Sequence, residues 1–253
     1  VYADGTNHFD DGPGVDTKSD ARTTVLRAGV EGRITPDWTT RLNYNQGTDR
    51  SNALVSASAF NIPGLFESQQ DQWTWQNDVK TPVGTVVAGA ETLLQKVNSS
   101  QAYAVTERRI NAVFAGLSGK ENSHSWQLNA RRDDNSQFGG SSTGYAGYGY
   151  QFNPNWRAHA GYGTSFVAPS FNQLYWPGFG NALLEPEEGK NLEFGVDWTQ
   201  GNHHVKLIRF DNKIRGFITS GKAPVNLPRA RIEGWTLGYD GTFDALTLRA
   251  AVD

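Results

Sequence analysis

Residues 165–190 concentrate the side-chain types best suited to holding a ligand. Aromatic rings and amides stand close together there, beginning with Phe171 and Asn172. The candidate contact residues are Gln173, Tyr175, Trp176, Phe179 and Asn181. Flat rings cover apolar ligand surface while amides bind a polar rim, so this composition fits a large amphipathic ligand. The alternative is structural: the stretch folds back onto the protein and binds nothing.

A second polar group lies at Asp133 and Asp134, which are also candidate substrate-binding residues. Their carboxylates can orient polar groups on a ligand. Arg131 and Arg132 come directly before them, so ion pairing within the protein is the favoured alternative. Neither interpretation involves chemistry on the ligand.

Several aspartates near the start of the chain suggest a metal. Asp10 and Asp11 are followed by Asp16 and Asp20, and converging carboxylates can hold Ca²⁺. Asp16 and Asp20 are therefore candidate calcium ligands. The next long loop, 51–66, contains no acidic residue, so a solvated acidic loop is the favoured alternative. We expect no required cofactor, with calcium as an option.

Catalysis is not expected. The five histidines are scattered along the chain, and no spacing fixes a Ser or Cys partner for any of them. The enzymatic alternative is an outer-membrane lipase with Ser and His on its outer wall. The net charge of -3 gives no reason to expect a nucleic-acid partner.

The elements that position these residues are indicated by turns. Short turn signals rich in Pro, Gly, Asn and Asp occur at 35–37, 81–84, 119–122, 153–155, 199–202 and 240–244. Longer polar stretches alternate with them, at 47–66, 97–104, 133–142, 165–189 and 212–228. Strict alternation of short and long connections is typical of antiparallel strands that cross a membrane repeatedly.

The segments between the turns alternate apolar and polar residues. One example is Leu192, Phe194, Val196 and Trp198, which alternate with Glu193, Gly195 and Asp197. No stretch reaches the roughly 18–20 apolar residues of a membrane helix. The mean hydropathy of -0.56 still suits a barrel, whose strands show lipid only every second side chain. A soluble sandwich would bury the apolar face instead, and between 203 and 218 the strand phase is ambiguous.

Four tryptophans favour the membrane. Each lies within about four residues of a short turn, on the apolar phase, as expected of an aromatic girdle at a bilayer interface. They are Trp38, Trp126, Trp156 and Trp198. Tryptophans that pin ordinary hairpins are the alternative.

The segment 163–198 resembles the barrel of TonB-dependent receptors, with cobalamin (vitamin B12) receptors the most similar. Its matching motifs are YGTS at 162–165, APSFNQLY at 168–175, GN at 180–181, PE at 186–187 and NLE at 191–193. Two further blocks agree in order, ARRDDNSQFG at 130–139 and RARIEGWTLGYDG at 229–241. In this family the region of 168–172 is shared across ligands, so 175–181 holds the better contact candidates.

The resemblance implies an all-β, antiparallel up-and-down transmembrane barrel of about 22 strands, of which the chain supplies about 12. Residues 1–253 are expected to be one part of that barrel domain, without the N-terminal plug and the C-terminal strands. The parent protein is then expected in the bacterial outer membrane, in contact with lipid. It would take up cobalamin with energy from TonB, which contacts the missing plug. A ferric-siderophore or haem receptor is the main alternative, followed by a passive porin and a soluble β-sandwich binding module.

Overall fold

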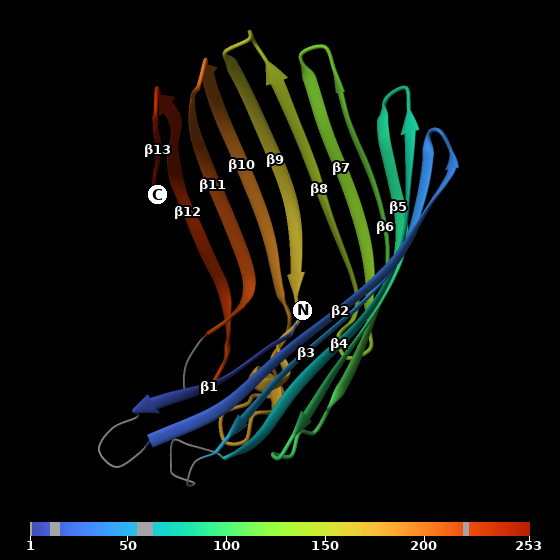
Figure 1. Ribbon diagram of the computed structural model, residues 1–253, viewed down its shortest axis with the longest axis vertical. Coiled ribbons are helices and arrows are strands. Elements are labelled where there is room, and N and C mark those ends of the chain that lie inside the picture. The colour runs from blue at the N-terminus through green and yellow to red at the C-terminus, as the bar shows by residue number, and fades with distance from the viewer. Residues whose placement is uncertain (1, 11–15, 55–62, 220–222) are drawn as a thin grey trace.

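The structure, a computed structural model, describes residues 2–10, 16–54, 63–219 and 223–253. These residues form one antiparallel sheet whose thirteen strands follow chain order, with a short helix beside it (Figure 1). Among the described residues, no helix is long and apolar enough to cross a membrane. The elements are β1 (Tyr2–Asp10), β2 (Asp16–Thr35), β3 (Trp38–Ala53), β4 (Gly64–Thr81), β5 (Gly84–Ser99), β6 (Glu107–Glu121), β7 (His124–Asn135), β8 (Gly139–Gln151), β9 (Trp156–Val167), α1 (Phe171–Tyr175), β10 (Glu187–Gln200), β11 (His203–Ile218), β12 (Asn226–Phe243) and β13 (Leu246–Val252).

The all-β antiparallel prediction is confirmed, with one strand more than the expected twelve. The additional strand is β1, which pairs with the first part of β2 from Tyr2 opposite Thr24 onwards. The acidic residues between Asp10 and Asp20 predict a solvated loop before the first strand, but Asp16 and Asp20 lie in β2. Backbone hydrogen bonds between β1 and β2 hold both segments extended regardless of side-chain polarity.

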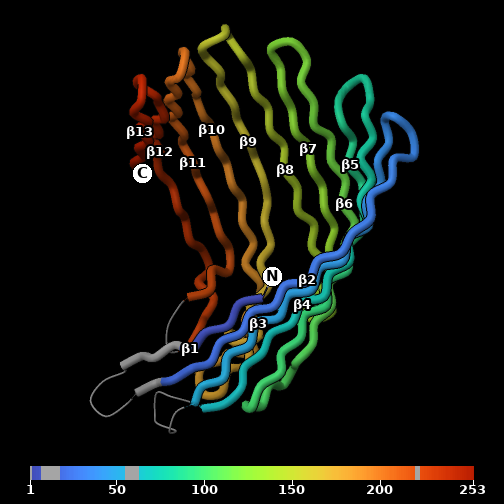
Figure 2. Tube along the Cα trace, in the orientation of Figure 1, coloured from blue at the N-terminus to red at the C-terminus, as the bar shows by residue number. Residues whose placement is uncertain are grey.

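The six short turns are confirmed as tight hairpins, and all six lie at one end of the sheet (Figure 1). Asn122 and Asp244 adopt positive φ angles of 51° and 47° in two of these hairpins, a conformation that Asn and Asp tolerate better than most residues. Long connections and α1 lie at the opposite end, and the sheet curves from β1 round to β13 (Figure 2).

One predicted long loop is wrong. Residues 133–142 were expected to be a loop, but β7 runs to Asn135 and β8 starts at Gly139, which leaves a three-residue connection. Polar side chains on both faces hide the period-two signal there. The strands therefore extend further toward the loop end than their apolar segments do.

Cross-strand register separates the two faces of the sheet. Residues directly opposite each other point to the same side. One such row passes through six strands without a charged side chain: Val86, Leu117, Leu128, Ala146, Tyr162 and Leu192. Leu128, Tyr162 and Leu192 are 46–54% exposed, so this outer face is an uncovered apolar band. A sandwich would cover it, and a lipid-facing wall does not need to.

The other face, here called the inner face, is charged. Arg131 forms ion pairs with Glu91 at 2.7 Å and Asp133 at 2.9 Å. Near the short hairpins, Asp197 is 3.2 Å from His159 and 3.6 Å from Arg157. Paired charges on one face and apolar side chains on the other are the arrangement of a membrane barrel with a wet interior.

The register also resolves the strand phase of β11. Val205 and Leu207 lie on the outer face, opposite Tyr239 and Leu237. Phe210 lies on the inner face above Gly234, where an added Cβ would come 2.8 Å from the phenyl ring. The apolar residues of β11 therefore lie on both faces, so periodicity alone could not assign the residues of this strand to one face or the other.

All four predicted girdle tryptophans lie on the outer face near the short hairpins. Trp156 pairs with Trp198, and Trp126 pairs with Tyr148. Further exposed aromatics join them at this level: Tyr148, Tyr150, Phe152 and Phe243. This belt marks one edge of the apolar band.

Candidate functional site

Helix α1 begins at a capping box that the sequence encodes. The hydroxyl oxygen of Ser170 accepts a hydrogen bond from the backbone N–H of Gln173, whose side-chain oxygen accepts one from the backbone N–H of Ser170. Two of the helix's otherwise unpaired donors are thereby satisfied. The side chain of Gln173 is thus used in folding the helix.

Arg108 of β6 fastens α1 to the inner face. Its guanidinium donates to the carbonyl oxygen of Pro169 at 2.9 Å and to the side-chain oxygen of Gln95. The same group lies 5.0 Å from the ring centre of Phe171 and 5.9 Å from that of Phe138. At 5% exposure, Arg108 is a buried cation held between two rings and two oxygens.

A small apolar core lies beneath the helix. Leu174, Leu184 and Ile218 are buried together, with Phe138 and Tyr175 packed against them. These residues come from α1, the segment after it and the ends of neighbouring strands. The motif at 168–184 is thus a folded unit at the loop end of the sheet, which supports its structural interpretation.

The chain doubles back after α1 through Gly180 and Asn181. The N–H of Gly180 donates to the Trp176 carbonyl at 2.7 Å. The Asn181 side chain donates to the Pro224 carbonyl at 3.0 Å, while its oxygen accepts from the backbone N–H of Leu183. Asn181, like Gln173, therefore makes hydrogen bonds that hold the loop.

Gly180→Ala is expected to destabilise this loop by about 1–3 kcal/mol, the usual range for overpacking. A Cβ at this position would lie 2.7 Å from each of three backbone atoms in residues 174–176. Hydrogen exchange of residues 171–185 should accelerate. Gly5→Ala is the control, because its Cβ would meet nothing within 4 Å; equal exchange in both variants would contradict the packing argument.

The remaining candidates of this segment form an aromatic surface. Trp176 lies 6.1 Å from Phe66, which is also 6.1 Å from Tyr103, measured between ring centres. Tyr103 donates its hydroxyl to the side-chain oxygen of Asn172 at 2.7 Å. Burial raises the pKa of Tyr103 to about 12, so the hydroxyl keeps its proton near neutrality.

Phe179 and Tyr175 have different surroundings. Phe179 is 45% exposed. Tyr175 packs against the small core, and its hydroxyl accepts a hydrogen bond from Gln137 at 2.6 Å. We define the mouth patch as Phe66, Tyr103, Asn172, Trp176 and Phe179. Phe66 and Tyr103 are not predicted from the sequence, because the only signal for each is an aromatic residue in or beside a long loop.

The two predicted acidic contacts separate. Asp133 lies on the inner face in the ion pair with Arg131. Asp134 lies on the outer face, exposed and opposite Asn111. The structure therefore does not bring Asp133 and Asp134 to one site, and a ligand role for either stays a prediction.

The calcium candidates lie on β2. Asp20 accepts a hydrogen bond from Thr6 at 2.8 Å, and the backbone of Asp16 pairs with Asp10, while the side chain of Asp16 is outside the described part of the structure. Asp11 is likewise outside it. Among the described residues, no three His, Cys, Asp or Glu side chains converge as metal ligands. Calcium binding stays a prediction.

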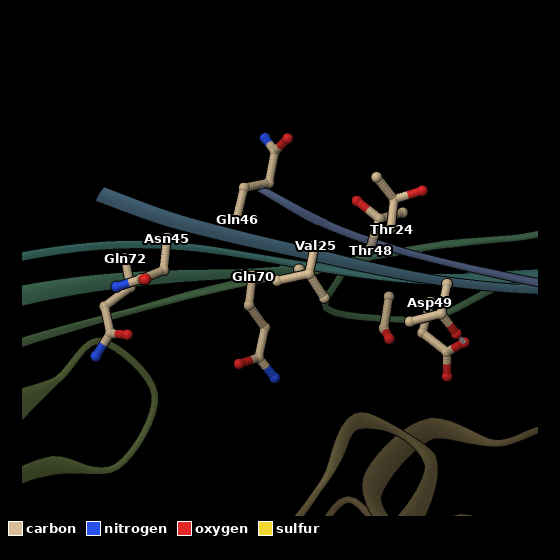
Figure 3. A pocket seen from close by; sticks show the side chains of 11 residues that line it. Thr24, Val25, Asn45, Gln46, Thr48, Asp49, Gln70 and Gln72 are labelled. Atoms are coloured by element: carbon tan, nitrogen blue, oxygen red, sulfur yellow. Dashed lines mark hydrogen bonds between the residues drawn. The ribbon is translucent and has the colours of Figure 1, made fainter. Parts of the chain in front are cut away.

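A separate hollow of about 330 Å³ lies against β2–β4. Gln70, Gln72 and Asp49 extend from the sheet to one side there, whereas Gln46 points the opposite way (Figure 3). This alternation matches the register, which places Gln70 and Gln72 on the inner face and Gln46 on the outer face. The inner wall thus offers hydrogen-bonding groups apart from the mouth patch.

Comparison with known proteins decides the family. A family model described as "TonB dependent receptor-like, beta-barrel" matches residues 1–253. The chain belongs to this family. TonB-dependent receptors of this kind are bacterial outer-membrane proteins, so the exposed apolar band faces lipid and the strands cross the outer membrane.

Curated relatives are vitamin B12 transporters BtuB. That of Photobacterium profundum is 28% identical over 92% of this chain and 40% of its own length. That of Vibrio vulnificus is 28% identical over 76% of this chain and 35% of its own length. The chain thus spans roughly two fifths of these relatives.

Solved structures confirm the fold. The siderophore receptor PirA from Acinetobacter baumannii superposes with a TM-score of 0.69, at 15% identity, over 91% of this chain and 43% of the receptor. An identity this low supports the shared architecture and carries no information about the ligand.

Proposed function

We propose that this chain forms part of the barrel wall of an outer-membrane receptor that takes up cobalamin. TonB would energise uptake through a plug domain carried elsewhere in the parent protein. The curated relatives support the ligand by their names, at 28% identity. Because each match covers a minority of the relative, transport remains a proposal for the whole protein.

The observation that carries the proposal is the mouth patch. Phe179 and Asn172 are exposed and Trp176 is half-buried against Phe66, all at the end of the sheet opposite the short hairpins. The hairpin end carries the aromatic girdle, and short turns of such barrels face the periplasm. The mouth patch would therefore face the exterior, where a ligand arrives. Cobalamin combines an apolar corrin face with an amide rim, which such a surface can cover.

Trp176→Ala combined with Phe179→Ala should weaken cyanocobalamin binding to the intact receptor about 10- to 100-fold. Each ring at the centre of a binding surface typically contributes about 1 kcal/mol or more, and about 1.4 kcal/mol corresponds to tenfold. Binding is measured by equilibrium dialysis with the purified full-length protein in detergent. Phe152→Ala is the matched control, because this phenylalanine is 61% exposed at a short hairpin on the opposite end.

Two outcomes would point to other ligands or another class. A ferric siderophore or haem could use the same rings and amides, so tight binding of a ferric catecholate without any cyanocobalamin binding would replace cobalamin with a chelate. Ion conductance through the purified intact protein with its plug in place would indicate a passive porin.

A further inference from the structure

The outer face of β10–β12 changes character above the apolar band. Moving from the short hairpins toward the loop end, the row of Phe194, Arg209 and Trp235 is followed by Leu192, Asp211 and Glu233. The next two rows hold five cations, which we call the cationic patch: Lys190, Lys213, Arg231, Arg215 and Arg229.

Cations oppose cations directly within this patch. Lys213 is the register partner of both Lys190 on β10 and Arg231 on β12. Arg215 opposes Arg229. Like charges directly opposite each other on neighbouring strands destabilise a sheet unless a counter-charge bridges them. Negatively charged groups near the patch are therefore needed to offset the repulsion between these cations.

The nearby carboxylates supply only part of this negative charge. Asp211 is 2.7 Å from Arg231 and 3.5 Å from Lys213. Glu233 is shared between Arg231 and Arg209, and Glu188 is 3.8 Å from Arg215.

Together with Arg209, the cationic patch makes six cations on this surface. The carboxylates there are three: Asp211, Glu233 and Glu188. Within the described residues, Lys190 and Arg229 make no ion pair, and both are exposed. Lys213 and Arg215 have side chains that are 63% and 76% exposed.

The same level of β1–β4 is balanced. Arg22 also opposes Arg50, but Asp4 and Glu67 flank that pair in the same row. Farther down, Asp71 accepts hydrogen bonds from Tyr44, Gln46 and Gln69. The outer face of β1–β4 therefore carries balanced charge at this level, whereas that of β10–β12 carries an excess of positive charge.

The position of the patch indicates its partner. Leu192, Phe194 and Trp235 lie next to it on the lipid-facing side and are 54%, 52% and 56% exposed. Cations just beyond an apolar band are at the height of lipid headgroups. We infer that the cationic patch binds the phosphate groups of an anionic lipid in the outer leaflet, whose acyl chains lie against these three side chains. The inference depends on the family assignment and is independent of the transported ligand.

The test uses the intact receptor in detergent and native mass spectrometry during titration with diphosphoryl lipid A. The triple variant K190Q/K213Q/R229Q should bind it about a hundredfold more weakly at low ionic strength, because each cation near an anionic membrane surface contributes roughly a factor of five. Monophosphoryl lipid A should bind the unaltered protein more weakly and be less sensitive to the changes. The control R33Q/K80Q/K120Q removes three cations near the short hairpins and should bind like the unaltered protein.

Salt dependence of the unaltered protein provides a second measurement that does not require the variant to fold. Bound lipid should fall as ionic strength rises, because phosphate–cation contacts at an exposed surface are screened. Unchanged binding across ionic strength, or equal losses in the triple variant and its control, would overturn the inference. So would an oligomer that dissociates on the triple change while lipid binding stays constant, since the patch would then join two copies.

Discussion

Arginine in place of Leu128 is expected to lower the free energy of unfolding of the intact receptor in a bilayer by about 2–4 kcal/mol, as for a cation at the midplane of a barrel's lipid face. Leu128 is the middle apolar residue of β7 on the outer face, between Trp126 and Ala130. Its neighbours in the row, Leu117 and Ala146, offer no counter-charge. A guanidinium there must either enter hydrocarbon or distort the strand.

Gln127→Arg is the matched control, one residue away on the inner face. Gln127 is exposed and opposes Ser118, in a wall that already carries paired charges. Its effect should stay within about 0.5 kcal/mol, the usual range for a surface substitution without special contacts. Unfolding by urea in phospholipid vesicles, followed by tryptophan fluorescence, compares the two. A larger loss for Gln127→Arg would mean that the apolar face is the inside, as in a soluble sandwich.

The sequence was most informative where side-chain chemistry and backbone geometry agree. Pro36 and Asn122 mark tight hairpins because each suits a turn conformation, and both hairpins lie where they were expected. The outer phase of β7 and β10 followed from alternation, since one face meets lipid and the other does not. In these segments a local pattern has a single structural explanation.

Prediction failed where backbone pairing alone maintains a strand. The ends of β7 and β8 between 133 and 142 are polar on both faces, so no alternation reveals them. The phase of β11 was ambiguous for the opposite reason, because the strand has apolar residues on both faces. Phe210 lies on the inner face above Gly234, and Leu207 lies on the outer face. Both depend on the partner strand, which a one-dimensional pattern does not contain.

Only part of the mouth patch could be predicted from the sequence, for a related reason. Rings at 171–179 stand together in sequence, but Phe66 joins them from the start of β4 and Tyr103 from the connection between β5 and β6. Gln173 and Asn181, predicted as ligand contacts, make hydrogen bonds that cap the helix and hold the turn, and a ligand role for either stays a prediction. An amide's partner depends on which backbone groups the fold brings within reach.

Arg108 is the residue whose loss should release the mouth patch. In the Arg108→Ala variant, the Pro169 carbonyl loses its charged donor and two rings lose a cation between them. Hydrogen bonds from charged groups contribute about 1.5–3 kcal/mol, and cation–π contacts about 0.5–2 kcal/mol. We expect the free energy of local opening of residues 168–184 to fall by about 2–4 kcal/mol. Hydrogen exchange there should accelerate at least tenfold, since about 1.4 kcal/mol corresponds to a factor of ten.

Arg109→Ala separates this anchoring from a general effect of losing charge on β6. Arg109 is the next residue, exposed on the outer face, and its hydrogen bonds to Ser136 use only backbone atoms of Arg109. Exchange at 168–184 should be unchanged in this variant. Arg108→Lys adds a second comparison, because a lysine keeps the charge but cannot reach Pro169 and Gln95 with a planar fork of donors. Intermediate exchange for lysine would show that geometry as well as charge holds the loop, whereas full protection in Arg108→Ala would mean that the apolar core beneath α1 is sufficient.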